Sequence, residues 1–243
     1  MLLGRKYRSA KRKTYGALSK ATYKISRKLR EMEIRHSRLY LPVDVMQTAG
    51  ALRPNSTLDK FTKVSETIYE KLGEGHGISV LDLGCNEGYF SLKLASKGMW
   101  VAGIDGDPEA LGVARFLQER FSINKASFYE ILTDKEDIQQ LPNFDVVIFL
   151  SVFQKWCGQY GFDEAFQMLE IIWSKSNQLM FFEMPDSLES EEAFKKVMPD
   201  MGETKSECRL YIQDMLSSLT SSSVTWIGGT PWSTALGIEA CFP

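Results

Sequence analysis

A short turn in the first half of the chain carries the residues best suited to hold a ligand. Residues 80–90 read VLDLGCNEGYF, with Asp82 before a turn from Gly84 to Gly88 and Glu87 inside it. Glycines let the backbone bend tightly and approach a ligand closely. A dinucleotide-binding turn would cradle a pyrophosphate with the spacing G-x-G-x-x-G. Acids would repel a pyrophosphate, so this turn favours a positively charged cofactor of the amino-acid type.

The elements that must position this turn follow from the hydrophobic pattern. Strands are expected at residues 78–84, 99–105, 126–133, 144–151 and 178–184, and helices at residues 58–75, 87–98, 108–121 and 162–176. Residues 41–57 are typical of a connector, residues 186–220 of a polar helical stretch, and residues 224–230 and 234–242 of an antiparallel pair. This alternation predicts an α/β fold with a mostly parallel sheet and helices on both faces. Such sheets bind ligands at the carboxyl ends of their strands.

With these elements in place, the chain resembles class I S-adenosylmethionine-dependent methyltransferases. VLDLGCNEGYF and the later GIDGDPEAL resemble the first two motifs of that family, and Asp82, Gly84, Gly88 and Asp105 match residue by residue. The resemblance implies a Rossmann-like, mostly parallel seven-stranded sheet and S-adenosylmethionine as the cofactor. It also implies that the glycine turn packs against the methionine part of the cofactor, and that Asp105 accepts hydrogen bonds from the ribose hydroxyls.

The same resemblance assigns further contacts to the cofactor. Ser151 and Val152 follow the fourth strand, at the positions that usually contact the cofactor through their backbone. Asp134 is matched more loosely to the adenine amino group. Arg53 is a candidate for binding the cofactor carboxylate. The expected cofactor-binding set is Asp82, Gly84, Cys85, Asn86, Glu87, Gly88, Asp105, Gly106, Asp134, Ser151, Val152 and Arg53. A nucleotide-free Rossmann-like domain, or an NAD enzyme with a degenerate turn, is the alternative. A fourth strand at the expected distance and a fifth ending in Glu183 disfavour that alternative.

Residues 151–161, SVFQKWCGQYG, follow the fourth strand, where the acceptor approaches in this family. From about residue 58 to 184 the chain most resembles the methyltransferase domain of bacterial enzymes that cap O-antigen polysaccharide by methylating a terminal phosphate. That group commonly has a histidine pair where this chain has Gln154 and Lys155. The stretch also resembles the S-V-x-K-W pattern of RNA phosphate-capping methyltransferases, so the acceptor stays open.

The acceptor-side candidates are Lys155 and Glu183 as catalytic residues, with Gln154, Trp156 and Tyr160 as substrate contacts. An ammonium at Lys155 would pair with a phosphate. A phosphate or carboxylate oxygen needs no base, whereas a sugar hydroxyl does, and Glu183 is the acid placed to act as that base or to orient the acceptor. Methyl transfer otherwise depends on positioning and electrostatics. Ordinary helix-start packing and solvation account equally well for Lys155 and Trp156.

The first forty residues differ physically from the rest of the chain. They hold thirteen lysines and arginines against two glutamates, whereas the remainder holds 16 basic and 29 acidic residues. Leu18, Ala21, Ile25, Leu29 and Met32 recur at helical spacing. We therefore expect a basic amphipathic helical arm with a linker at residues 1–45 and a methyltransferase domain at residues 46–243. The arm suits RNA, an anionic membrane or a partner protein, and its apolar stripe slightly favours the last two over a plain solvated helix.

The remaining composition limits the class of protein. Four cysteines and two histidines form no C-x-x-C pair and no zinc spacing, which indicates a metal-free protein of the reducing cytoplasm. No apolar run reaches the ~18–20 residues that span a bilayer. The sequence predicts a methyltransferase that O-methylates a sugar or phosphate of a cell-surface glycan, or a related small molecule, in the cytoplasm at the inner membrane face. The alternatives are an RNA methyltransferase that uses the arm, and an inactive methyltransferase-like scaffold.

Overall fold

The computed structural model describes residues 54–74, 76–184, 197–220, 223–230 and 233–239. The predicted arm, most of its linker, Arg53 and the first part of the predicted stretch at 186–220 lie outside the described residues. The domain division therefore stays a prediction.

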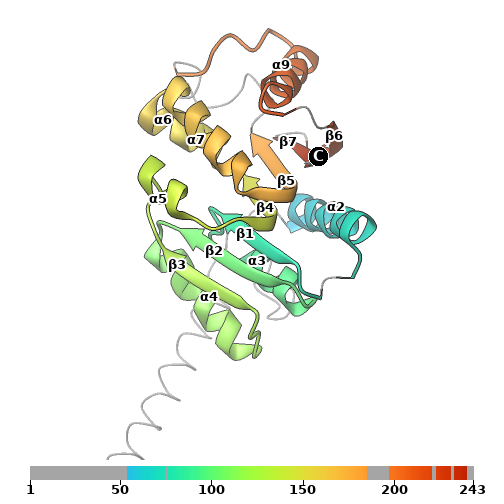
Figure 1. The fold of residues 1–243 in the computed structure, drawn as a ribbon, viewed down its shortest axis with the longest axis vertical. Coiled ribbons are helices and arrows are strands. Elements are labelled where there is room, and N and C mark those ends of the chain that lie inside the picture. Colours follow the sequence, from blue (N-terminus) through green and yellow to red (C-terminus); the bar gives the residue numbers. More distant parts are fainter. Residues whose placement is uncertain (1–53, 75, 185–196, 221–222, 231–232, 240–243) are drawn as a thin grey trace, which may run out of the picture. The chain divides into compact units, whose positions relative to one another are not determined.

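Seven strands form one sheet in the order β3-β2-β1-β4-β5-β7-β6 (Figure 1). The strands are β1 (Ser79–Leu83), β2 (Trp100–Asp105), β3 (Ala126–Glu130), β4 (Phe144–Leu150), β5 (Ser176–Met184), β6 (Val224–Thr230) and β7 (Ser233–Glu239). The first five are mutually parallel, and the terminal pair β7 and β6 extends the sheet in antiparallel register beyond β5. The strand order reverses between β1 and β4, so their carboxyl ends open the crevice in which such sheets bind ligands.

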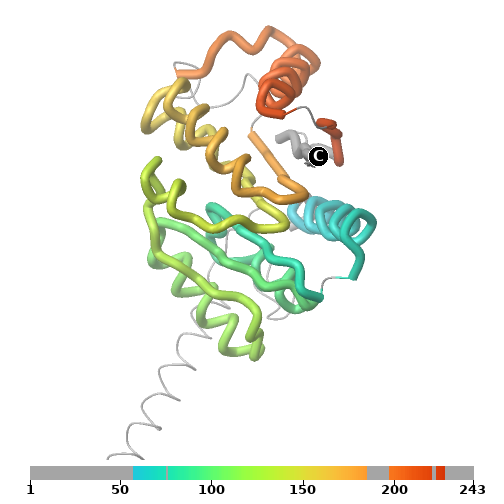
Figure 2. Tube along the Cα trace, viewed as in Figure 1, coloured from blue at the N-terminus to red at the C-terminus, as the bar shows by residue number. Residues whose placement is uncertain are grey.

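Helices cover both faces of the sheet. They are α2 (Pro54–Leu72), α3 (Tyr89–Ser96), α4 (Pro108–Arg120), α5 (Lys135–Gln140), α6 (Phe153–Tyr160), α7 (Phe162–Ser174) and α9 (Lys205–Ser217). Figure 1 shows α3 and α4 on one face and α7 on the other. Phe61 packs edge-on against Tyr89 and Phe90, which places α2 beside α3. Along the chain trace, α2 is the blue first helix of the described residues, and α9 is their last helix, toward the red end (Figure 2).

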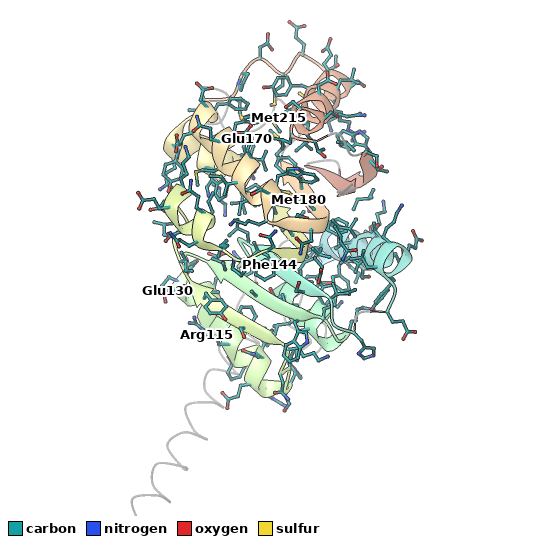
Figure 3. All side chains as sticks on the ribbon, in the orientation of Figure 1. Arg115, Glu130, Phe144, Glu170, Met180 and Met215 are labelled. Carbon is teal, nitrogen blue, oxygen red and sulfur yellow. The ribbon has the colours of Figure 1, made fainter. Side chains whose placement is uncertain are left out.

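One cluster of the hydrophobic core lies between the sheet and the helices that follow β3. Val147, Phe149 and Met180 of the two central strands are fully buried against Leu169 of α7 and Ile212 of α9. Figure 3 shows the contrast between Met180 in the interior and charged side chains such as Glu130 and Glu170 at the periphery. An apolar run of this kind is expected of a parallel strand that is covered on both faces. The predicted α/β Rossmann-like fold with a parallel sheet is therefore confirmed.

Several predicted boundaries were wrong. Helix α2 begins at Pro54, inside the predicted connector, because proline suits the first position of a helix, where its missing N–H costs nothing. Strand β3 ends at Glu130, three residues short of the prediction. Helix α5 was not predicted because 6 residues are too short to show a helical repeat, and the 8-residue α6 was not predicted because residues 151–161 were interpreted only for their chemistry. Of the predicted stretch at 186–220, the described part is helical only in α9.

Candidate functional site

The glycine turn between β1 and α3 has an unusual backbone. Gly84, Asn86 and Gly88 have φ values of 79°, 51° and 74°, which lie in the left-handed region. The N–H groups of Gly84 and Cys85 both donate to the carbonyl of Ile104 in β2, at 2.8 and 3.0 Å. Helix α3 starts at Tyr89, two residues later than predicted, because the turn extends through Gly88.

Gly84 lies against the residue that follows β4. A Cβ built on Gly84 would lie 2.3 Å from Cγ2 of Val152, closer than any real contact. A Cβ on Gly88 would lie 2.9 Å from the ring of Phe128 and from Cβ of Ala114. Both glycines are therefore required by close packing as well as by backbone conformation. This packing joins the turn after β1 to the turn after β4.

Asp105 ends β2 with its carboxylate held in place by the backbone. The N–H of Asn86 donates to Oδ2 at 2.7 Å, and the N–H of Asp107 donates to Oδ1 at 2.9 Å. The side chain is half-buried, and its carboxylate keeps lone pairs that these two bonds do not use. An acid fixed in this manner can accept hydrogen bonds from a pair of neighbouring hydroxyls.

Asp82 lies beneath the turn and has a different environment. Its side chain is 4% exposed and accepts a hydrogen bond of 2.5 Å from the Ser91 hydroxyl. Burial raises the pKa of Asp82 from its ordinary 3.8 to about 6, because the loss of water outweighs the stabilising bond from Ser91, and the nearby Asp105 charge adds slightly. Burial also raises the pKa of the Cys85 thiol, so this cysteine stays protonated and unreactive.

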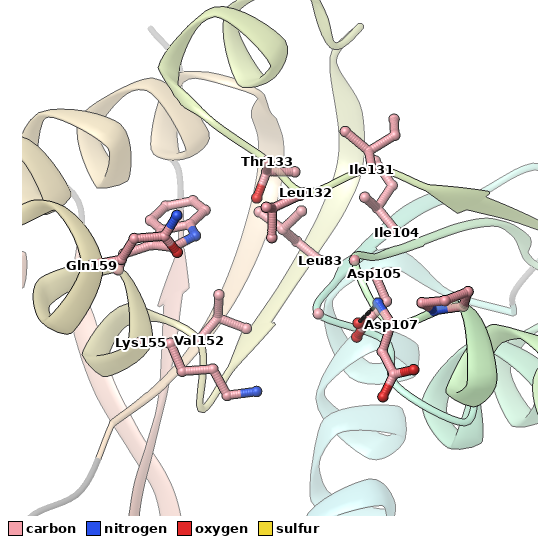
Figure 4. Close-up of a pocket in the computed structure, with 14 residues that line it drawn as sticks. Leu83, Ile104, Asp105, Asp107, Ile131, Leu132, Thr133, Val152, Lys155 and Gln159 are labelled. Atoms are coloured by element: carbon pink, nitrogen blue, oxygen red, sulfur yellow. Dashed lines mark hydrogen bonds between the residues drawn. The ribbon is translucent and has the colours of Figure 1, made fainter.

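A cavity of about 440 Å³ opens at the carboxyl ends of β1 to β4 (Figure 4). The cavity brings together these predicted site residues: Gly84, Asp105, Gly106, Val152, Lys155 and Trp156. It is also lined by residues that sequence reasoning missed, namely Ile131, Leu132 and Thr133 after β3 and Gln159 of α6. Leu132 is 72% exposed, and such a side chain at the mouth of a cavity is suited to cover an apolar ring. An exposed leucine directly after a strand was the available signal for it.

Lys155 comes from the first turn of α6 and extends toward the side of the cavity that carries Asp105 and Asp107 (Figure 4). Its side chain is exposed, and within the described part of the chain it forms no ion pair. Trp156, one residue later, is 4% exposed and packs on Phe149 with ring centroids 4.8 Å apart. The cavity therefore has one cationic side chain on a wall whose other members are apolar or amide groups.

Other predicted residues are not part of the cavity lining. Asp134 caps α5, where its Oδ1 accepts from the N–H of Asp137 at 2.8 Å. Tyr160 donates to the carbonyl of Thr133 at 3.4 Å and so supports the loop after β3. Gln154 is half-buried, and its Oε1 has no partner among the described residues.

The strand-end residues Ser151 and Glu183 bind each other beside the cavity. The Ser151 hydroxyl donates to Oε2 of Glu183 at 2.9 Å. Glu183 is 1% exposed and also forms an ion pair with Lys60 of α2. Glu87 is half-buried in the turn itself.

Neither a metal site nor a membrane-spanning helix is found in the described part of the chain. No group of three or more histidine, cysteine, aspartate or glutamate side chains there could hold a metal ion. Likewise, none of its helices is both long enough and apolar enough to cross a bilayer.

The fold and the site define a Rossmann-like domain with a small-ligand cradle at the switch point of its sheet. A family model described as a methyltransferase domain matches residues 74–223, and the chain belongs to that family. It is an S-adenosylmethionine-dependent methyltransferase by family, and the expected cofactor is confirmed.

Known proteins match part of this chain. The O-antigen chain terminator bifunctional methyltransferase/kinase WbdD of Escherichia coli is 38% identical over 117 residues, which cover 47% of this chain and 16% of WbdD. A ubiquinone biosynthesis O-methyltransferase of Aeromonas salmonicida is 34% identical over 90 residues, or 36% of each chain. A crystal structure of WbdD superposes with a TM-score of 0.66 and 26% identity, covering 84% of this chain and 44% of WbdD. This chain thus spans less than half the length of these relatives.

A more distant structure shows the same fold. The magnesium protoporphyrin IX methyltransferase of Synechocystis, solved with bound S-adenosylmethionine, gives a TM-score of 0.51 at 21% identity, covering 76% of this chain and 81% of that one. The predicted resemblance to O-antigen chain-capping enzymes is confirmed by the WbdD matches, which are stronger than this one in identity and TM-score.

Proposed function

We propose that this methyltransferase transfers a methyl group to an oxygen of a phosphorylated sugar, as part of a cell-surface glycan or a related small molecule. The observation that carries the proposal is the exposed ammonium of Lys155 on the cavity wall, without an ion-pair partner among the described residues. The similarity to an O-antigen chain terminator supports the same acceptor class. A cation in this place is suited to pair with phosphate.

The cavity fits the cofactor in its shape and in its charge. Its volume of about 440 Å³ is in the range of small-molecule sites. At the glycine turn, the backbone itself forms one wall of the cavity. The Asp105 carboxylate, held by the N–H of Asn86, lies on another wall. Apolar side chains of Ile104 and Leu132 lie between them. S-adenosylmethionine supplies a sulfonium-bound methyl group that an acceptor oxygen can take.

We assign individual roles to the chain's own residues on this basis. Gly84 and the turn to Gly88 would hold the methionine part, and Asp105 would accept from the ribose hydroxyls. Leu132 would cover the adenine ring. The acidic groups of the turn would balance the positive charges of the cofactor. Asp134 caps α5 through Oδ1, and its neighbours Ile131, Leu132 and Thr133 line the cavity, so we assign the adenine surroundings to these neighbours first.

The arrangement of acids favours an acceptor oxygen that is already ionised. The carboxylates lining the cavity, Asp105 and Asp107, both accept hydrogen bonds from backbone N–H groups. Glu183 has one oxygen engaged by Lys60 and the other by Ser151. Protonation of Glu183 would weaken its bonds to Lys60 and Ser151, and we assign the remaining lone pairs of Asp105 to the ribose hydroxyls. A phosphate oxygen needs no such base, and Lys155 would hold it.

We expect Asp105→Ala to weaken binding of S-adenosylhomocysteine at least about tenfold, a loss of ~1.4 kcal/mol. The physical reason is that alanine removes both acceptors for the ribose hydroxyls. Asp105→Asn keeps one oxygen and the volume, and should give an intermediate affinity. Titration calorimetry with the three proteins measures this directly, and equal dissociation constants would contradict the role of Asp105.

The acceptor is tested by comparing phosphorylated and unphosphorylated sugars. We expect methyl transfer from radiolabelled S-adenosylmethionine to hexose phosphates and lipid-linked glycan phosphates, and not to the parent sugars. Lys155→Gln should raise KM for the phosphorylated acceptor by about 10- to 100-fold, because a charge-assisted hydrogen bond is worth about 1.5–3 kcal/mol. Lys155→Arg should retain most activity, and neither change should alter the affinity for S-adenosylhomocysteine. An unchanged KM in Lys155→Gln would overturn the proposal.

RNA methylation is the second candidate, and two observations favour it. The 23S rRNA (uracil(1939)-C(5))-methyltransferase RlmD of Aliivibrio fischeri is 41% identical over 63 residues, which is 26% of this chain and 14% of RlmD. The first forty residues are strongly basic, as an RNA-gripping arm would be. Radiolabel in an added RNA fraction that disappears when residues 1–40 are deleted would support it. The same deletion, assayed with anionic vesicles, tests the membrane role proposed for the arm.

A further inference from the structure

A buried ion pair links α2 to the carboxyl end of β5. Glu183, the residue before the end of β5, is 1% exposed, and its Oε1 accepts from the ammonium of Lys60, whose side chain is 17% exposed. The two residues are 123 positions apart in the chain. Removing a charge from water is strongly unfavourable unless it is paired. A pair of this kind adds little net stability over apolar side chains of similar volume, so stability alone gives a weak account of it.

The second oxygen of Glu183 holds the turn after β4. Oε2 accepts from the Ser151 hydroxyl at 2.9 Å, and the Glu183 carbonyl accepts from the Ser151 N–H at 2.9 Å. Ser151 has a φ of 58°, a left-handed conformation that side chains other than glycine adopt only at a cost. The two bonds from Glu183 stabilise this conformation.

The conformation of Ser151 decides where the next residues point. Val152 follows directly, occupies the position before the first residue of α6 and meets the glycine turn at Gly84. Val152, Lys155 and Trp156 all line the cavity. A rotation of the backbone at residue 151 would therefore move one whole wall of the site.

We propose that Lys60 is a positioning residue of the active site: through Glu183 it holds Ser151 in the left-handed conformation that sets Val152 and the first turn of α6 against the cofactor cradle. Lys60 thus acts through another residue, from a helix that supplies no side chain to the described cavity lining. Helix α2 is thereby coupled to cofactor binding. The inference does not depend on which acceptor is methylated.

The experiment compares cofactor affinity with stability in matched variants of the full chain. Lys60→Met removes the ammonium and leaves Glu183 as an unpaired buried charge, and we expect binding of S-adenosylhomocysteine to weaken at least about tenfold. Lys60→Arg leaves Glu183 with a cationic partner and should bind S-adenosylhomocysteine within about threefold of the original protein. Lys63→Met, an exposed lysine on the same helix, is the control and should leave affinity and thermal midpoint unchanged.

A double variant separates positioning from simple destabilisation. Lys60→Met with Glu183→Gln removes the unpaired charge, so its thermal midpoint should return toward that of the original protein. Its affinity for S-adenosylhomocysteine should stay at least about fivefold lower than that of the original protein. The reason is that the methionine side chain at position 60 cannot donate a hydrogen bond to the amide at position 183, so α2 no longer holds that side chain in place. Affinity that returns together with the midpoint would overturn the proposal, as would Lys60→Met that binds normally. If Lys60→Met alone does not fold, the double variant still decides.

Both readouts use the cofactor product alone. A failure of the Lys60 role would appear as normal binding in these variants, whereas a failure of the proposed acceptor would appear only in transfer assays. The two results are therefore distinguishable.

Discussion

Gly84→Ala is expected to lower the free energy of unfolding by about 2–5 kcal/mol and to abolish measurable binding of S-adenosylhomocysteine. Two costs add. A left-handed backbone, here with φ of 79°, costs a residue other than glycine about 1–2 kcal/mol. The new methyl group would also lie 2.3 Å from Val152 Cγ2, and relieving an overpacked contact costs about 1–3 kcal/mol. Urea unfolding and calorimetric titration measure the two effects.

A second glycine in the chain isolates the contact from the backbone. Gly73 has a φ of 81°, and a Cβ there would meet nothing within 4 Å. Gly73→Ala should therefore show only the backbone cost of about 1–2 kcal/mol and should bind the ligand normally. Adding Val152→Ala to Gly84→Ala removes the clashing methyl and should recover part of the stability. Equal losses in Gly73→Ala and Gly84→Ala would show that the contact with Val152 does not matter.

The glycine turn could be predicted from the sequence because its signal is local. Two glycines and an acid at fixed spacing between a strand and a helix indicate one backbone shape. The place of Asp105 in the site could also be predicted, because this residue ends the next strand. The cavity indeed joins Gly84 and Asp105. The parallel sheet could be predicted equally well, since its buried strands are almost continuously apolar.

The parts that could not be predicted depend on contacts between distant segments. The pairing of Lys60 with Glu183 spans 123 positions and leaves no local pattern in either helix or strand. Glu183 was expected at the site by its place at a strand end, but only the structure shows that both its oxygens are engaged. Asp134 is a contrasting case, because an acid three residues before Asp137 is a local capping pattern that could have been recognised.

Asp82→Asn is expected to stabilise the protein at pH 8 by up to about 3 kcal/mol and to change little at pH 4. Burial raises the pKa of Asp82 to about 6 from the ordinary 3.8, and about two pH units correspond to ~3 kcal/mol. A carboxyl with a raised pKa contributes fully to stability below pH 4, and this contribution is lost as pH rises through 6. Asparagine has no charge to bury, so the difference between the two proteins should grow over that window.

Asp145 provides the opposite case within the same sheet. Burial raises the pKa of Asp145, but the N–H and hydroxyl of Ser79, at 2.8 and 2.7 Å, and further donors outweigh it, so the net direction is downward. A lowered pKa contributes stability above the ordinary value, and that stability is lost as pH falls. Asp145→Asn should therefore destabilise the protein at pH 8 and matter less at low pH. The measurement is the free energy of unfolding, from urea titrations at several pH values. If Asp82→Asn and Asp145→Asn changed this free energy with pH in the same direction, the assignment would be contradicted.

The cost of burying Asp82 has a consequence for function. A negative charge beneath the glycine turn attracts a cationic ligand above it, and it does so most strongly where the surroundings exclude water. Asp82→Asn should thus be more stable at pH 8 and yet bind S-adenosylhomocysteine, whose amino group is positive, more weakly than the original protein. If the free energy of unfolding rises while the affinity for S-adenosylhomocysteine falls, the Asp82 charge strengthens ligand binding and lowers the stability of the protein. Affinity that rises with stability would mean that Asp82 only supports Ser91 and the turn.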